Sequence, residues 1–286
     1  MILSTPLLVG TLLIVDSLHY VFARMLIPHL PPSVSAFFVL LVSTIEVGIY
    51  GIATGRLRFE SFRKNIWFFL GIGLLVAVST NLNYAAVRFI DPGTAALLGK
   101  TGKIWSLGLG LFWLREKLTR LQVLGAALAI SGIFVLSYQA GEYTKVGTIM
   151  ILASTFMYAI HTGMTKKYGA EMDFINFFFF RLLITSSFLF VITSVTRMIT
   201  WPSLTAWGYL LLVGTIDVTL SRAVFYLALR RLDLSIHTVV LTLSPVVAVL
   251  WTIVFFAIYP SPRRLIGGAI VILGVLIVGN FRASRK

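Results

Sequence analysis

The chain is dominated by long apolar runs, each close to the length that a helix needs to cross a bilayer. About 20 mostly apolar residues span the hydrocarbon core. Ten such runs are predicted as membrane helices, at about 4–26, 34–54, 66–87, 92–114, 121–139, 146–166, 174–196, 206–229, 235–258 and 265–281. The gaps between them are short and rich in breakers, which leaves no room for a soluble domain. The sequence therefore predicts an all-α membrane protein of ten transmembrane helices.

Composition agrees with a protein that lives in a bilayer. Hydrophobic residues make up 58% of the 286 and charged residues 12%, against roughly 25% charged residues in soluble domains. The net charge of +14 would suggest nucleic acid in a soluble protein. Here the basic residues gather in the gaps between apolar runs, where they set orientation. We expect a lipid bilayer as partner and no nucleic acid.

The distribution of Lys and Arg predicts the orientation. With both termini on the same side, the gaps and the tail on that side hold fourteen basic residues and the opposite gaps hold six. The positive-inside rule therefore places both termini in the cytoplasm. The first apolar run has no basic segment before it and contains Asp16 and His19, so we expect it to remain as a helix rather than to be cleaved as a signal peptide.

The sequence repeats itself when it is shifted by 142 residues. This single frame pairs His19 with His161, Tyr84 with Tyr226, Arg88 with Arg230, Gly125 with Gly267 and Gly132 with Gly274. The predicted halves, 1–143 and 144–286, carry five spans each. Because five is odd, the second half enters the membrane upside down, which is the construction of many secondary transporters.

Three segments carry a family resemblance: "LREKLTRLQVLGAALAISGIFVL" (114–136), "ILASTFMYAIHTGMTKKYGAEMDFINFFFFRLLI" (151–184) and "LSPVVAVLWTIVFFAIYPSPRRLIGGAIVILGVLIV" (243–278). They resemble the EamA-type repeats of the drug/metabolite transporter superfamily. The resemblance implies two inverted five-helix repeats around a central cavity, alternating access, no enzymatic activity and the plasma (inner) membrane of a prokaryote. The halves differ, since Val39 is the counterpart of Arg181 and Lys103 that of Pro245.

Several ionisable side chains lie inside the predicted spans. Each charge near the bilayer centre costs about 2.5–3.5 kcal/mol on insertion scales, so such residues normally face a cavity or a partner. We therefore expect most of them to line a polar interior: Asp16, Glu46, Lys100, Lys103, Arg181, Asp217 and Arg222.

The stretch "GKTGK" (99–103) contains two of these cations. It is not a phosphate-binding P-loop, because Gly93 and Gly99 enclose five residues rather than four. Lys100 and Lys103 are three apart and share a helical face. One interpretation is an anion clamp, joined by Arg181 or Arg222. The other is that the cations only neutralise the carboxylates of Asp16, Glu46 and Asp217.

Other polar residues extend the candidate site. Asp16, His19 and His161 are candidates for a proton relay, since histidine titrates near neutral pH, or for hydrogen bonds between helices. Their spacing does not match a zinc site. Candidate substrate contacts also include Asn83, Tyr84 and Tyr226, although the two tyrosines also suit packing or interfacial anchoring.

These features together predict a secondary transporter of a small organic metabolite, with preference for an anionic one. We expect no cofactor, coupling to a proton or a counter-substrate, and a monomer or homodimer. Asp16, His19, Glu46, His161 and Asp217 are assigned to proton coupling or charge balance. The alternative is an exporter of amino acids or of hydrophobic or cationic drugs, in which carboxylates hold an amine. An intramembrane enzyme would need a nucleophile with its base, which the sequence does not offer.

Overall fold

The structure is a computed structural model that describes residues 5–102, 104–105, 109, 120–137, 142–169, 172–225 and 244–283. Within these ranges every regular element is a helix. In chain order they are α1 (Thr5–Ser17), α2 (His19–Leu26), α3 (Pro32–Ala53), α4 (Phe59–Lys64), α5 (Ile66–Ala86), α6 (Pro92–Gly99), α8 (Arg120–Ser137), α9 (Glu142–Tyr168), α10 (Phe174–Val195), α11 (Leu204–Val213), the π-helix η1 (Gly214–Leu220), α14 (Ser244–Phe256) and α15 (Pro262–Ala283).

Five helical stretches are long and apolar enough to cross a membrane: Pro32–Ala53, Ile66–Ala86, Lys145–Thr165, Phe174–Val195 and Leu204–Phe225. Shorter apolar stretches lie in α8, α14 and α15. The prediction of an all-α protein with membrane-spanning helices is confirmed for the described residues. The first, fourth, fifth, eighth and ninth predicted spans extend in part beyond these residues, so the total of ten helices stays a prediction.

Three local features differ from the predicted spans. The first span is divided at Leu18 into α1 and α2, and the short α4 lies in what was predicted as a gap. The eighth span contains the π-helix η1, where the Gly214 carbonyl accepts a hydrogen bond from Ser43 Oγ at 2.9 Å. A π-helix turn shifts carbonyls out of the usual ladder. Ser43, which donates to the Gly214 carbonyl, lies on α3 and is 171 residues away in the sequence.

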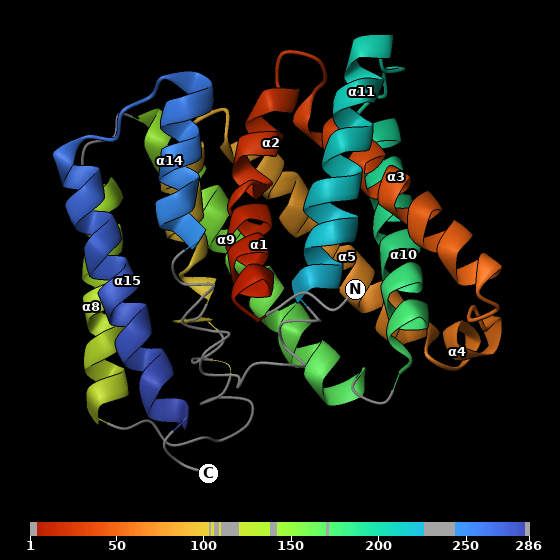
Figure 1. The fold of residues 1–286 in the computed structure, drawn as a ribbon, viewed down its shortest axis with the longest axis horizontal. Helices are drawn as coiled ribbons and strands as arrows, with labels where there is room; N and C mark the ends of the chain where they lie inside the picture. The colour runs from red at the N-terminus through yellow and green to blue at the C-terminus, as the bar shows by residue number, and fades with distance from the viewer. Residues whose placement is uncertain are drawn as a thin grey trace.

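The helices stand side by side, with α8 and α15 at one edge and α3 and α10 at the other (Figure 1). Helices α1, α5, α9 and α11 lie between these edges. The main packing contacts join α8 to α15, α5 to α9, and α10 to both α3 and α5. Residues that are far apart in the sequence are therefore brought together across the middle of the bundle.

Glycines account for the close crossing of α8 and α15. A Cβ on Gly125 would lie 2.9 Å from the Gly274 carbonyl oxygen, and one on Gly132 would lie 2.9 Å from that of Gly267. Small residues allow such close approach of helix backbones. Under the 142-residue shift Gly274 is the counterpart of Gly132, and Gly267 is that of Gly125. The two contacts are therefore reciprocal, as expected for antiparallel helices related by a local two-fold axis.

The same reciprocity joins α3 to α10. The ring centroids of Phe37 and Phe190 are 5.5 Å apart, while a Cβ on Gly48 would lie 2.9 Å from the Phe179 ring. Phe190 is the counterpart of Gly48 under the 142-residue shift, and Phe179 is that of Phe37. Both bounds of α10 also lie 142 residues after those of α3.

Candidate functional site

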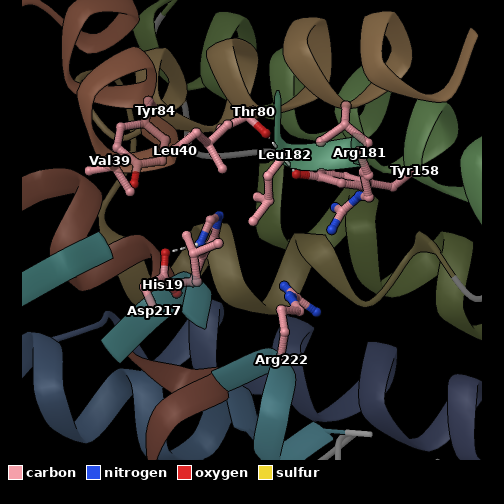
Figure 2. Close-up of a pocket in the computed structure, with 12 residues that line it drawn as sticks. His19, Val39, Leu40, Thr80, Tyr84, Tyr158, Arg181, Leu182, Asp217 and Arg222 are labelled. Carbon is pink, nitrogen blue, oxygen red and sulfur yellow. Dashed lines mark hydrogen bonds and ion pairs between the residues drawn. The ribbon is translucent and has the colours of Figure 1, made fainter. Parts of the chain in front are cut away.

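A small cavity lies at the centre of the bundle and is lined by side chains from α2, α3, α5, α9, α10 and the η1 region (Figure 2). Its volume is about 30 Å³. A cavity needs roughly 10–15 Å³ by this measure to hold one water, so this one has room for about two. The lining residues are His19, Val39, Leu40, Val76, Thr80, Tyr84, Tyr158, Arg181, Leu182, Asp217, Val218 and Arg222.

His19 and Asp217 form a pair in the cavity wall. Their Nδ1 and Oδ2 atoms lie 2.8 Å apart, and the Asp217 side chain is only 3% exposed. The tyrosine rings of Tyr20 and Tyr84 stand edge-on to the imidazole, at centroid distances of 4.9 and 6.1 Å. The two rings cover part of the imidazole, whose side chain remains 22% exposed.

Arg181 and Arg222 bring two positive charges to the same cavity. Figure 2 shows the two guanidinium groups pointing toward one space from opposite sides, with the His19–Asp217 pair beside it. The Arg222 guanidinium also lies 5.9 Å from the centroid of the Phe225 ring. With His19 neutral, the two arginines exceed the single lining carboxylate by one charge. The residues that line the cavity thus carry a net positive charge.

Hydroxyl groups complete the polar part of the wall. Thr80 Oγ1 and Tyr158 OH lie 2.9 Å apart and share a hydrogen bond. The Tyr84 hydroxyl is buried and has no hydrogen-bond partner among the residues that the structure describes. A buried hydroxyl normally finds a partner, so Tyr84 has a donor and an acceptor to offer to a bound molecule.

Lys100 lies outside this cavity, in a neighbouring polar cluster. Its Nζ donates to Ser244 Oγ at 2.7 Å and lies 3.5 Å from Asp16 Oδ2. The cluster joins α1, α6 and α14, and it matches the charge-neutralising interpretation of Lys100. Lys103, the other lysine of the predicted clamp, lies outside the described residues.

Glu46 is placed on the opposite side of η1 from the cavity. Its two carboxylate oxygens accept hydrogen bonds from Thr215 and Thr219, each at 2.5 Å. It lines a separate groove at the end of α3. Among the residues that the structure describes, Glu46 is thus paired with hydroxyls and with no cation.

Two further predicted residues, His161 and Asn83, are not among those that line the cavity. His161 Nε2 lies 3.4 Å from Thr165 Oγ1 on the same helix. Asn83 is buried on α5 and does not line the cavity. Tyr226 lies outside the described residues.

Sequence reasoning missed Thr80 and Tyr158, which line the cavity together. The repeat could have revealed both, because the 142-residue shift pairs Thr80 with Arg222 and Tyr158 with Asp16. Counterparts of charged residues in an inverted repeat are natural candidates for the same central site.

No metal site emerges from the parts of the chain that the structure describes. Those parts contain no group of three or more His, Cys, Asp or Glu side chains that could hold an ion. The site is instead built from arginines, one carboxylate, one imidazole and hydroxyls.

Comparisons with known proteins point to one family. The profile of the EamA-like transporter family matches residues 5–138 and again residues 145–280. A "Probable terminal-alkyne amino-acid exporter" of Streptantibioticus cattleyicolor is 26% identical over 72% of this chain and 69% of its own length. A "Probable amino-acid metabolite efflux pump" of Salmonella typhimurium is 27% identical over 54% of this chain and 50% of its own.

A solved crystal structure shares the fold. It superposes with a TM-score of 0.69 over 98% of this chain and 99% of its own, at 18% sequence identity. At that identity the likeness concerns the arrangement of the helices alone.

Proposed function

This chain belongs to the EamA-like transporter family, and we propose that it is a secondary transporter of a small carboxylate-bearing metabolite, with amino acids as the best-supported class. The observation that carries the substrate class is the charge of the cavity wall, where two guanidinium groups face one carboxylate. Arginine is suited to this task because its planar fork donates two parallel hydrogen bonds to a carboxylate.

The carboxylate contacts are assigned to Arg181 and Arg222. Lys100 is a weaker candidate than the sequence suggested, because Asp16 and Ser244 already engage its ammonium group. The Tyr84 hydroxyl, the Tyr158 hydroxyl and Thr80 offer further hydrogen bonds around the same space. The site thus holds an anionic group on one side and neutral polar groups on the other.

An amino acid fits this set better than an anion without an amine. Asp217 lines the same cavity and can take part in binding an ammonium group. Two relatives bear names that refer to export of amino acids or their metabolites. A zwitterion would place its carboxylate between the arginines and its ammonium near Asp217.

The His19–Asp217 pair is the proposed coupling element. Imidazole is the side chain that changes charge near neutral pH, and this imidazole contacts the carboxylate proposed to hold the substrate amine. Arrival of the ammonium group at Asp217 would compete with His19 for the carboxylate. Such competition links the movement of a proton to that of the substrate.

Alternating access of two inverted repeats, 1–143 and 144–286, is the proposed transport cycle. The family profile matches once in each half, and the contacts of α8 with α15 and of α3 with α10 are reciprocal under the repeat. The cavity is too small for an amino acid in this structure, so its walls must separate to admit one. Inverted halves that rock around a fixed central site supply that motion.

The predicted setting is a prokaryotic plasma membrane with both termini in the cytoplasm. The basic residues of the 54–65 segment, Arg56, Arg58, Arg63 and Lys64, would then face the cytoplasm. Two relatives are named as an exporter and an efflux pump. If this chain also exports, its substrate would enter the transporter from the side on which these basic residues lie.

Thermal stabilisation of the detergent-purified protein tests the substrate class. A ligand at a hundredfold excess over its dissociation constant stabilises the folded state by about 2.7 kcal/mol. The panel contains amino acids, the amines that remain after decarboxylation, simple carboxylates and sugar phosphates. Amino acids are expected to stabilise the protein most, simple carboxylates less, and the amines least. Stabilisation by amines alone would contradict a carboxylate site and favour the exporter of cationic drugs.

A further inference from the structure

A second and larger hollow lies away from the central cavity, at the end of α3. Its volume is about 960 Å³, which is near the upper end of the range for ligand sites. Val47 and Tyr50 of α3 form one wall, Thr219 and Ala223 the other, and Phe174 and Phe178 of α10 contribute to the lining between them. Figure 1 shows α3 and the lower end of the α11–η1 helix parting in front of α10. We call this hollow the α3–η1 groove.

Two arginines are held at the mouth of the α3–η1 groove. Arg56 and Arg58 both line it, and Leu57 between them turns the other way, toward Gly51, where an added Cβ would lie 2.7 Å from Leu57 Cγ. Alternate residues of an extended segment point to the same side. Gly55, at φ +62°, makes the turn that begins this segment.

The buried side chain of Asn176 fixes this segment to α10. Its Nδ2 donates to the Arg56 carbonyl at 2.8 Å, and its Oδ1 accepts from the Arg58 backbone N–H at 2.7 Å. Asn176 is 3% exposed. The backbone of both arginines is therefore held in place by a buried contact, so the pair of cations is built into the groove.

The acids that share the groove are already engaged. Asp173 Oδ2 accepts hydrogen bonds from the Ile175 and Asn176 backbone N–H groups and from Asn176 Nδ2, and Glu46 accepts from two threonines. Among the described residues, no carboxylate lies within 4.0 Å of the Arg56 or Arg58 guanidinium. The lining holds two arginines and two carboxylates, but neither guanidinium is in an ion pair among the described residues, so both can contact a further anion.

This end of the bundle has the features of a membrane interface. Trp67 is 82% exposed and Phe59 66% exposed, and aromatic residues gather where the hydrocarbon meets the headgroups. Arg63 and Lys64 of α4 are exposed beside them. Beyond the arginines the lining of the α3–η1 groove includes Val47, Ile175 and Phe178, which suit hydrocarbon.

We propose that the α3–η1 groove binds one anionic phospholipid, whose phosphate lies between Arg56 and Arg58 and whose acyl chain lies along α10. The two guanidinium groups, which form no ion pair among the described residues, suit the phosphate, and the apolar lining suits the chain. This site is separate from the central cavity, because Glu46 and Thr219 lie across η1 from Asp217. The proposal does not depend on the identity of the transported metabolite.

Native mass spectrometry of the purified protein tests this assignment. Phosphatidylglycerol and phosphatidylcholine with identical acyl chains are titrated in a neutral detergent. Each basic residue near a membrane surface contributes about fivefold in affinity for anionic lipid, so the first phosphatidylglycerol should bind roughly thirtyfold more tightly than phosphatidylcholine. R56Q/R58Q should lose that preference. The matched variant R63Q/K64Q, which removes equal charge from α4 outside the groove, should keep it.

Two further experiments test where the lipid binds. A variant that fills the groove distinguishes binding inside it from general attraction to the positive surface, and competition with glycerol phosphate tests whether the headgroup alone is bound. Ala223→Trp fills the groove and leaves both arginines in place, and it should abolish the tight first binding event; Ala127→Trp, on the exposed face of α8, should not. Glycerol phosphate at the same concentration should not displace the lipid. Equal loss in R56Q/R58Q and R63Q/K64Q, unchanged binding in Ala223→Trp, or displacement by glycerol phosphate would each overturn the proposal.

Discussion

His19 and Asp217 are 198 residues apart in the sequence, and their Nδ1 and Oδ2 atoms lie 2.8 Å apart in the wall of the central cavity. The pair joins α2 of the first half to η1 of the second. It therefore stands where a proton and a substrate amine can compete for one carboxylate. Its proposed role in coupling gives the first prediction.

His19→Gln should separate transport from its driving force. The amide keeps a hydrogen bond to Asp217 but does not take up a proton, so exchange of labelled for unlabelled substrate in proteoliposomes should persist. Accumulation driven by an imposed pH gradient should fall to background. His29→Gln is the matched control, because His29 is exposed and stacks on Tyr209 rather than lining the cavity, and it should retain both activities. Loss of both activities in His19→Gln would contradict a role confined to coupling.

Glu46 and Asp217 should respond differently to neutralisation. Asp217 lines the cavity, whereas Glu46 accepts from Thr215 and Thr219 outside it. Asp217→Asn should weaken amino-acid binding about tenfold or more, because a hydrogen bond to a charged group contributes about 1.5–3 kcal/mol. Glu46→Gln can still bond both hydroxyls and should bind within about twofold of the parent. Equilibrium binding of labelled substrate measures both, and a reversed order would favour Glu46 as the amine site.

Packing in the bundle predicts opposite effects for two glycines. A Cβ on Gly73 of α5 would overlap Ile184 of α10, whereas one on Gly208 of α11 meets nothing within 4 Å. Overpacking costs about 1–3 kcal/mol, and alanine gains up to about 1 kcal/mol over glycine inside a helix. Gly73→Ala should therefore lower the melting temperature and Gly208→Ala should raise it. A rise for both would mean that α5 and α10 do not pack as closely as described.

Sidedness can be measured because the chain contains no cysteine. Ser61→Cys introduces one thiol in α4, among the basic residues, and Thr200→Cys introduces one in the exposed segment before α11. An impermeant maleimide applied to intact cells should label Thr200→Cys at once and Ser61→Cys only after the membrane is opened. The reverse pattern would contradict cytoplasmic termini.

Much of the fold could be predicted from the sequence. The apolar runs at 34–54, 66–87 and 174–196 match α3, α5 and α10 to within two residues at each end, because an uninterrupted apolar run in a bilayer has to satisfy its backbone as a helix. The repeated glycines also proved informative, since they meet where α8 crosses α15. Hydropathy and repetition are properties that a sequence shows directly.

The local irregularities and the pairing of charges could not be predicted in this way. In the π-helix η1 the Gly214 carbonyl accepts a hydrogen bond from Ser43 on α3. Residues 214–220 alone contain no pattern that predicts a π-helix. Likewise Lys100 meets Asp16 and Ser244, whereas its spacing from Lys103 had suggested a clamp. Such contacts depend on which helices become neighbours, so they become visible only with the fold.

Arg181 and Arg222 are proposed to bind the carboxylate of the transported metabolite. Binding of the best amino acid from the stabilisation panel, measured against its decarboxylated amine by calorimetry, tests this proposal most directly. Each of Arg181→Gln and Arg222→Gln should weaken amino-acid binding about 10- to 150-fold and leave binding of the amine unchanged. Arg88→Gln, on an exposed residue outside the cavity, should have no effect. If both cavity variants bind the amino acid as tightly as the parent, the carboxylate is held elsewhere and the account is wrong.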